Sequence, residues 1–146
     1  MLAELQTRLQ QIVASAPILA GRPIKTEDKG NLVSEVENAL VMHAICVVVA
    51  PANGNAKPGQ AKGNAYFEED LEVTIHRGLL EDEHGLSTVA IVDVLIPLIH
   101  GAPIVANHPA PHAAQLFRAK GHRLIENGDG TFARVITVSI DHQWGS

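Results

Sequence analysis

The segment HGAPIVANHPAPHAAQLF, residues 100–117, contains three histidines whose side chains could bind a metal ion. A zinc site needs three or four ligands that converge at about 2.0 to 2.3 Å from the metal. His108 and His112 have the i, i+4 spacing that would bring two imidazoles together on one face of a helix. His100 or His122 would then have to complete the site.

Two prolines weaken this zinc hypothesis. Pro109 and Pro111 lie between His108 and His112 and disfavour a regular helix there. The same prolines fit an exposed loop whose histidines are neutral or partly charged near neutral pH. We therefore expect no bound metal and no cofactor. His108, His112 and His100 stay as the candidates of an alternative, metal-binding interpretation.

The carboxylates at positions 68–72 could act as acids or bases in catalysis. Glu68, Asp70 and Glu72 alternate, however, so they share one face of a strand, and such an alternation is typical of a solvated strand face. The chain contains no GxSxG, HExxH or GxGxxG motif. The sequence therefore does not predict an enzyme.

Composition and charge exclude further classes of protein. With 146 residues, 46% of them apolar, residues 1–146 are expected to form a single domain. The formal net charge of −5 and the aromatic content of 3% argue against binding to nucleic acid. The single cysteine, Cys46, excludes an internal disulfide and is expected to be a small buried side chain. Glu4 near the start argues against a signal peptide, and no apolar run is long enough to span a membrane.

The first half of the chain is expected to form a helix, an edge strand, a central strand and a long loop. Leucine and isoleucine recur at helical spacing over residues 2–16, and Pro17 ends this helix because it disfavours helical geometry at the residue before it. The stretch IKTED, within residues 18–38, suggests a short edge strand. The β-branched residues of ALVMHAICVVVA, residues 39–50, predict a central strand. Residues 51–65, rich in Gly, Pro and Asn, predict a loop at the tip of a hairpin.

The second half predicts a strand, a helix and a closing hairpin. Residues 67–78, FEEDLEVTIHRG, alternate between an apolar and an acidic face. A helix is expected between Ser87, a suitable N-cap, and Gly101, a suitable stop, with Pro97 kinking or ending it. The turn sequence NGDG predicts a hairpin within residues 122–144. Alternation places four residues of its last strand in the core: Phe132, Ile136, Val138 and Ile140. The expected fold class is α+β, a mostly antiparallel sheet with two helices packed on one face.

This order of elements resembles the tail-terminator and tail-completion proteins of long-tailed bacteriophages. The resemblance covers most of the chain and is best from Phe67 to Gly101, where the strand FEEDLEVTIHRG is followed by a charged turn and by an apolar helix that ends in LIHG. The final strand, ENGDGTFARVITVSID, continues it. It implies a protein of the virion tail, assembled in the host cytoplasm, that forms a six-fold ring without enzyme activity.

The resemblance also implies partners. The ring would cap the tail tube, end its polymerisation and offer a docking surface to the head. The partners would be further copies of this chain, the tail tube protein and a neck or connector protein, with the sheath as another candidate. Genomic DNA would pass through the ring without sequence-specific binding. We hypothesise that Glu68, Asp70 and Glu72 line the lumen and keep the DNA from adhering to its wall. Eight residues of the two long loops would make assembly contacts: Asn53, Gly54, Lys57, Pro58, Lys62, Asn107, Pro109 and Pro111.

Two alternatives stay open at this point. A different neck, tube or baseplate ring component could share the fold, because a fold does not fix a role. A small histidine-based metal-binding protein or metal-dependent enzyme is the alternative from another class.

Overall fold

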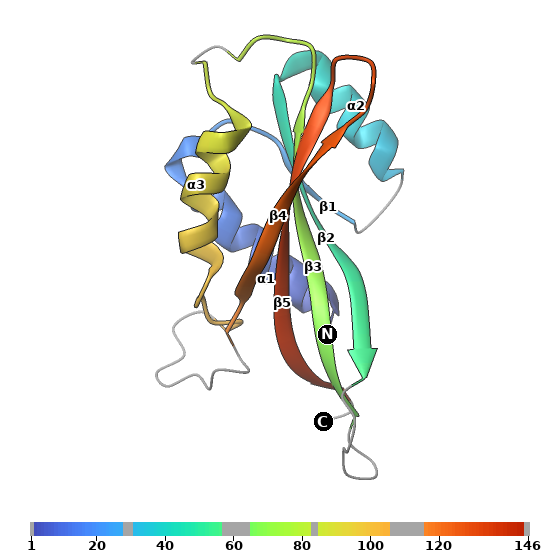
Figure 1. The fold of residues 1–146 in the computed structure, drawn as a ribbon, viewed down its shortest axis with the longest axis vertical. Coiled ribbons are helices and arrows are strands. Elements are labelled where there is room, and N and C mark those ends of the chain that lie inside the picture. Colours follow the sequence, from blue (N-terminus) through green and yellow to red (C-terminus); the bar gives the residue numbers. More distant parts are fainter. Residues whose placement is uncertain (1, 28–30, 57–64, 83–84, 106–115, 145–146) are drawn as a thin grey trace.

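The described part of the protein folds around one five-stranded sheet with three α-helices (Figure 1). The computed structural model describes residues 2–27, 31–56, 65–82, 85–105 and 116–144. The elements are α1 (Leu2–Ala14), a 3-10 turn η1 (Pro17–Leu19), β1 (Ile24–Thr26), α2 (Leu32–Met42), β2 (Ile45–Ala56), β3 (Ala65–Arg77), α3 (Thr88–Ile99), β4 (Arg118–Glu126) and β5 (Phe132–Trp144). The strand order is β1-β2-β3-β5-β4, and among these described strands only β1 and β2 pair in parallel. The α+β class is confirmed.

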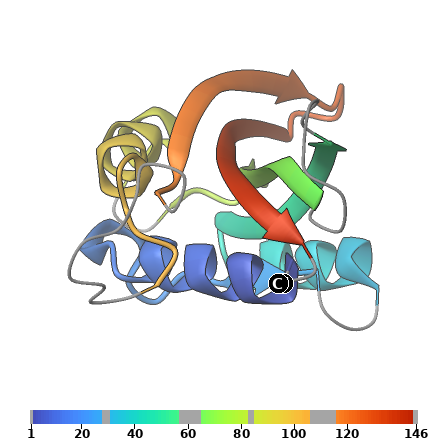
Figure 2. The same cartoon turned by 90° about the horizontal axis from the view of Figure 1, so that it is seen from below.

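The core lies between one face of the sheet and the helices α1 and α3. Alternate residues of the three central strands reach it, as the period of two along a strand requires. Leu71, Val73 and Ile75 of β3 are all fully buried in it. Seen end-on in Figure 2, the sheet is curled, with α3 beside β4 and α1 beneath β2. In the described part of the chain, no helix is long and apolar enough to cross a membrane.

The ends of the predicted helices are confirmed. α1 stops at Ala14, before Pro17. The Ser87 side chain accepts a hydrogen bond from the backbone N–H of Ala90 and so caps α3, as expected of a serine at this position. Pro97 lies in the last turn of α3, and Gly101 follows with a φ of 85°, a left-handed conformation that favours glycine.

The prediction of a strand over residues 39–50 is wrong in its first part. Residues 39–42 belong to α2, a helix that the sequence did not predict, and β2 begins only at Ile45. The side chain of Asn31 caps α2 by accepting a hydrogen bond from the N–H of Ser34. The β-branched run VVV lies in the strand, whereas ALVM completes a helix that starts earlier, and the single apolar stretch spans both elements.

The prediction of a loop over residues 51–65 is also partly wrong. β2 continues through residues 51–56, and β3 already begins at Ala65. The pairing shifts between Pro51 and Asn53, so a β-bulge accommodates the proline and the ladder resumes beyond it. Pairing with β3 outweighs the poor strand propensity of Gly and Asn, as tertiary context commonly does. Residues 57–64 lie outside the described residues.

The closing hairpin is confirmed. β4 and β5 pair in an antiparallel ladder, and Gly128 and Gly130 in the turn have φ values of 80° and 91°. Among the four residues predicted for the core, Ile136, Val138 and Ile140 are fully buried. Phe132 is only half-buried, because it lies beyond the end of the core, where the sheet borders a cleft.

Candidate functional site

A charged face covers the side of the sheet opposite α1 and α3. The predicted alternation of β3 is confirmed: Glu68, Asp70 and Glu72 point away from the core, whereas Glu69, between them, is 4% exposed on the core side. The ladder places Asp141 of β5 directly opposite Glu68. Together with three basic residues of β4, these carboxylates form what we call the charged face: Glu68, Asp70, Glu72, Asp141, Arg118, Lys120 and Arg123.

Each carboxylate of the charged face meets a cation that reaches across from β4. Lys120 Nζ lies 3.1 Å from Glu68 Oε1 and 3.4 Å from Asp70 Oδ1. The remaining pairs are Arg123 Nη2 with Glu72 Oε2 at 2.9 Å and Arg118 Nη2 with Asp141 Oδ1 at 3.5 Å. The charged face is therefore a mosaic of both signs and not the acidic wall that the sequence of β3 alone suggested.

Hydrogen bonds favour the charged forms of two members of the charged face, Glu68 and Lys120. The pKa of Glu68 is lowered, chiefly because Lys120 and the hydroxyl of Ser139 donate hydrogen bonds to its carboxylate. The pKa of Lys120 is raised by the same bond. Both groups are ionised over a wider pH range than free side chains are.

Sequence reasoning missed the basic half of the charged face. The hairpin was predicted to start at His122, so Arg118 and Lys120 fell in the loop before it. A register shift between Ala119 and Gly121 displaces the alternation of β4, which hides the grouping of the three cations from a period-two pattern. The signal that could have found them is the occurrence of three basic residues within the six positions 118–123, whereas the acidic strand β3 that they meet is separated from β4 by β5.

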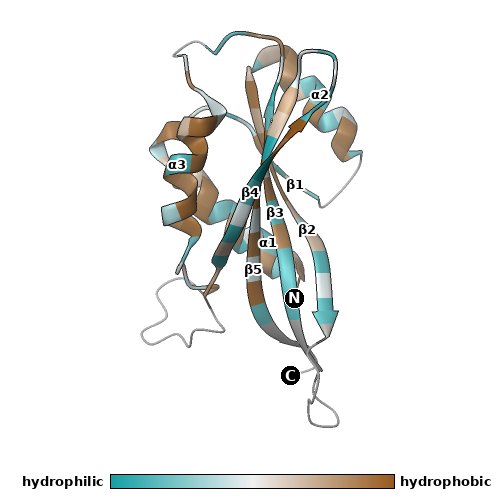
Figure 3. Ribbon diagram, in the orientation of Figure 1, coloured by the Kyte–Doolittle hydropathy of each residue, from teal (hydrophilic) through white to brown (hydrophobic). Residues whose placement is uncertain are grey.

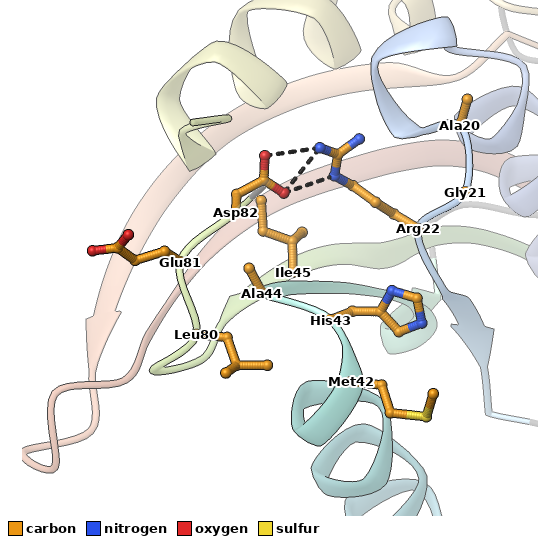
Figure 4. Close-up of a pocket in the computed structure, with 10 residues that line it drawn as sticks. All are labelled: Ala20, Gly21, Arg22, Met42, His43, Ala44, Ile45, Leu80, Glu81 and Asp82. Carbon is orange, nitrogen blue, oxygen red and sulfur yellow. Dashed lines mark hydrogen bonds and ion pairs between the residues drawn. The ribbon is translucent and has the colours of Figure 1, made fainter. Parts of the chain in front are cut away.

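A second polar feature is an ion pair between Arg22, which lies between η1 and β1, and Asp82, which lies between β3 and α3. Arg22 Nη2 lies 2.9 Å from both carboxylate oxygens of Asp82, and Arg22 Nε donates to Asp82 Oδ1 at 3.3 Å (Figure 4). The two side chains are only 14% and 8% exposed. Asp82 also accepts a hydrogen bond from the N–H of Leu86, and Arg22 Nη1 donates to the carbonyl of Ile18. This arrangement ties the segment before β1 to the segment that leads into α3.

The Arg22–Asp82 pair borders a cavity of about 290 Å³. Figure 4 shows His43 and Met42, at the end of α2, on the other side of this cavity. The guanidinium is already bound by a carboxylate and a carbonyl, and no nucleophile paired with a base lines the cavity. The arrangement therefore acts as a structural clamp.

Burial keeps the Cys46 thiol and the His76 imidazole neutral at one end of the central strands. Cys46 and His76 face each other across β2 and β3. Burial raises the pKa of the Cys46 thiol to about 11 and lowers the pKa of His76. The prediction that Cys46 is a small buried side chain is confirmed.

The histidines considered for a metal site fall on different elements. His100 caps the end of α3, and its Nδ1 accepts a hydrogen bond from the N–H of Ala119 at 3.2 Å. His122 lies exposed on β4. Among the described residues, no group of three or more His, Cys, Asp and Glu side chains could hold a metal ion. His108 and His112 lie outside those residues.

The predicted assembly loops are only partly described. Asn53 and Gly54 belong to β2, where they pair with Asp70 and Glu69. The Glu69 carboxylate packs so closely over Gly54 that a Cβ at this position would come within 2.5 Å of an oxygen, so a larger residue there would displace this carboxylate. The other six residues lie outside the described part of the chain: Lys57, Pro58, Lys62, Asn107, Pro109 and Pro111.

Comparison with known proteins finds a similarity in structure alone. The sequence matches no model of a protein family. It matches no curated protein sequence either. The fold is similar to a chain of a solved structure described as "Virion of native gene transfer agent (GTA) particle", with a TM-score of 0.59. The superposition covers 94% of this chain and 92% of the other at 11% sequence identity, which shows that the two chains share a fold.

Proposed function

We propose that this protein is a non-enzymatic structural component of a phage-like virion, and that it forms the ring that terminates the tail. The observation that carries the proposal is the similarity in fold to a chain of a gene transfer agent virion over nearly the whole length of both chains. The resemblance of residues 67–101 to tail-terminator proteins supports the narrower role.

Two exposed apolar surfaces suit the subunit contacts of a ring. A cyclic ring needs two different, complementary surfaces on each subunit. α2 exposes Val41, at 74%, and Met42, and α3 exposes Val94, at 38%, and Leu98. The two helices lie on opposite sides of the molecule in Figure 1, and Figure 3 shows that α3 is apolar around most of its circumference. Exposed apolar side chains that group on one helix are common at interaction sites.

The charged face suits the wall of a DNA passage. The hypothesis that Glu68, Asp70 and Glu72 face the lumen is retained, with a changed electrostatic argument. Lys120 and Arg123 are already bound by carboxylates, so they are less available to DNA phosphates than unpaired cations would be. A wall of paired charges lets DNA slide past without strong attraction.

The mass of the purified protein in solution tests the ring. We expect a particle about six times the 15.6 kDa mass of the chain, measured by light scattering after size exclusion. Val41→Asp, on α2, would place a charge in the proposed contact and should reduce the particle to monomers. Val105→Asp, which changes another exposed valine beyond α3, should leave the particle intact. Equal behaviour of the two variants would contradict an interface at α2.

A further inference from the structure

A cleft with two arginines lies beneath the first turn of α3, apart from the charged face and next to the cavity beside Arg22, with which it shares Glu81 and Asp82. Its volume is about 480 Å³. It is lined on one side by Ser87, Thr88 and Val89 of the helix and on the other by Arg77, Phe132 and Arg134 of the sheet.

The register of the sheet brings the two arginines together. Arg134 on β5 pairs with Ile75 on β3, and Arg77 follows two residues later, opposite Phe132. Both arginines therefore leave the sheet on the face that carries the core, as diagonal neighbours about 7 to 8 Å apart. Ile75 is fully buried, so the arginines begin where the packed core ends.

Arg134 has no partner for its charge within the described part of the chain. Its Nε is buried and makes no hydrogen bond there. Arg77 Nη1 donates to the carbonyl oxygens of Ala44 and Leu80, which satisfy donors but do not neutralise the guanidinium. Asp82 also lines the cleft, yet it is bound to Arg22. A buried donor without an acceptor is costly, so the cleft favours an incoming anion.

Carboxylate is the group that best fits these donors. Guanidinium presents a planar fork of N–H donors that matches the two oxygens of a carboxylate. The partial positive charge at the start of α3 adds to the attraction. The exposed surroundings of the cleft combine one acidic residue, Glu81, with apolar side chains: Val89 is 50% exposed, and Leu124, which pairs with Arg134 in the ladder, is 46% exposed. Apolar side chains beside a cationic centre fit a protein segment better than the phosphates of DNA.

We propose that this cleft is a docking site for a partner protein, in which Arg77 and Arg134 bind an acidic side chain flanked by apolar residues. That the partner is another virion subunit rests on the proposed function, whereas the carboxylate site itself does not.

Nuclear magnetic resonance on the full chain, labelled with 15N, tests the site. The probe is the peptide acetyl-Leu-Glu-Leu-amide, and its matched control is acetyl-Leu-Gln-Leu-amide. We expect the Glu peptide to shift the Nε–H resonances of Arg134 and Arg77 saturably, with a dissociation constant in the millimolar range because the contact is small. The Gln peptide should shift them little.

Matched variants show whether the arginines are responsible. Arg134→Gln should weaken binding of the Glu peptide about tenfold or more, because it removes a charged hydrogen-bond donor. Arg134→Lys keeps the charge but loses the planar fork of donors, so its affinity for the Glu peptide should lie between those of the parent chain and Arg134→Gln. If Arg134→Gln does not fold, the lower affinity of Arg134→Lys than of the parent chain is the test. Arg123→Gln, on the charged face, should leave the affinity unchanged. Equal shifts with both peptides, or full affinity in Arg134→Gln, would overturn the proposal.

A third titration, with inorganic phosphate, distinguishes between the possible ligands. It also makes the test of the cleft independent of the proposed ring. Saturation by inorganic phosphate without binding of the Glu peptide would show a phosphate site and would also overturn the proposal. All of these titrations report on the isolated chain. Failure of the titrations therefore leaves the mass measurement of the ring untouched, and failure of that measurement leaves the carboxylate site standing.

Discussion

Two arginines on either side of the segment that leads into α3 have opposite surroundings. Arg22 is held by both oxygens of Asp82 and by a backbone carbonyl, at a site with little solvent exposure. Arg134 carries the same group, partly buried, with no partner for its Nε among the described residues. The first arrangement is saturated and stabilises the fold, whereas the second leaves donors free for something outside the chain. Proteins commonly tolerate such unsatisfied groups where they bind.

Breaking the saturated pair should change stability the most. Asp82→Ala would leave the Arg22 guanidinium buried without its counter-charge and would remove the acceptor for Leu86 N–H. The free energy of unfolding should fall by about 3 kcal/mol, as for other buried pairs that lose one partner. Urea unfolding followed by circular dichroism measures it.

Asp93→Ala is the control for this change. Asp93 is exposed on α3 and makes no ion pair with another described residue. It should alter stability by less than about 0.5 kcal/mol. A similar loss in both variants would show that the Arg22–Asp82 pair adds no more to the free energy of unfolding than an exposed carboxylate does.

Replacing each arginine by methionine should change the stability of the fold in opposite directions at the two sites. Arg134→Met removes an unsatisfied buried donor while keeping the apolar stem, so the isolated chain should gain about 1 kcal/mol of stability. Arg22→Met should lose stability, because Asp82 would then be the uncompensated buried charge. Thermal unfolding of the two variants measures the difference. A loss of the same size in Arg134→Met would mean that Arg134 supports the fold and is not held ready for a partner.

A much smaller change is expected on the charged face. Lys120→Met should cost less than about 1 kcal/mol, because Lys120 and Glu68 are 45% and 37% exposed and water screens the pair. The folded pKa of Glu68 lies below its usual 4.5, so the pair stabilises the fold above that pH and loses its effect as the pH falls below it. The variant should therefore lose less stability on acidification than the parent chain. An identical pH dependence of unfolding would contradict the pairing.

Local signals made part of this fold predictable. Ser87 and Gly101 bracket α3, and the NGDG turn marks the last hairpin, because capping and turn chemistry depend on residues close in sequence. α2 escaped detection because its last four residues continue directly into the apolar run of β2. The extension of β2 over residues 51–56 depends on pairing with β3, which no local pattern contains.

The candidate sites were less predictable than the fold. The alternation of Glu68, Asp70 and Glu72 placed them correctly on one face, but their partners on β4 depend on strand order. Arg22 and Asp82 are sixty residues apart in sequence, and Arg77 meets Arg134 only through the register of β3 and β5. Contacts of this kind become visible only when the topology is known.

Electron microscopy of tail tubes mixed with this protein is the decisive test of a ring that terminates the tail. The tubes would be purified from the phage-like particle that is proposed to carry the protein, and the protein would bear a gold label. We expect a single ring at one end of each tube and no further tube growth once the ring is bound. Label spread along the tube, or tubes that bind no protein and continue to grow, would contradict the proposed role.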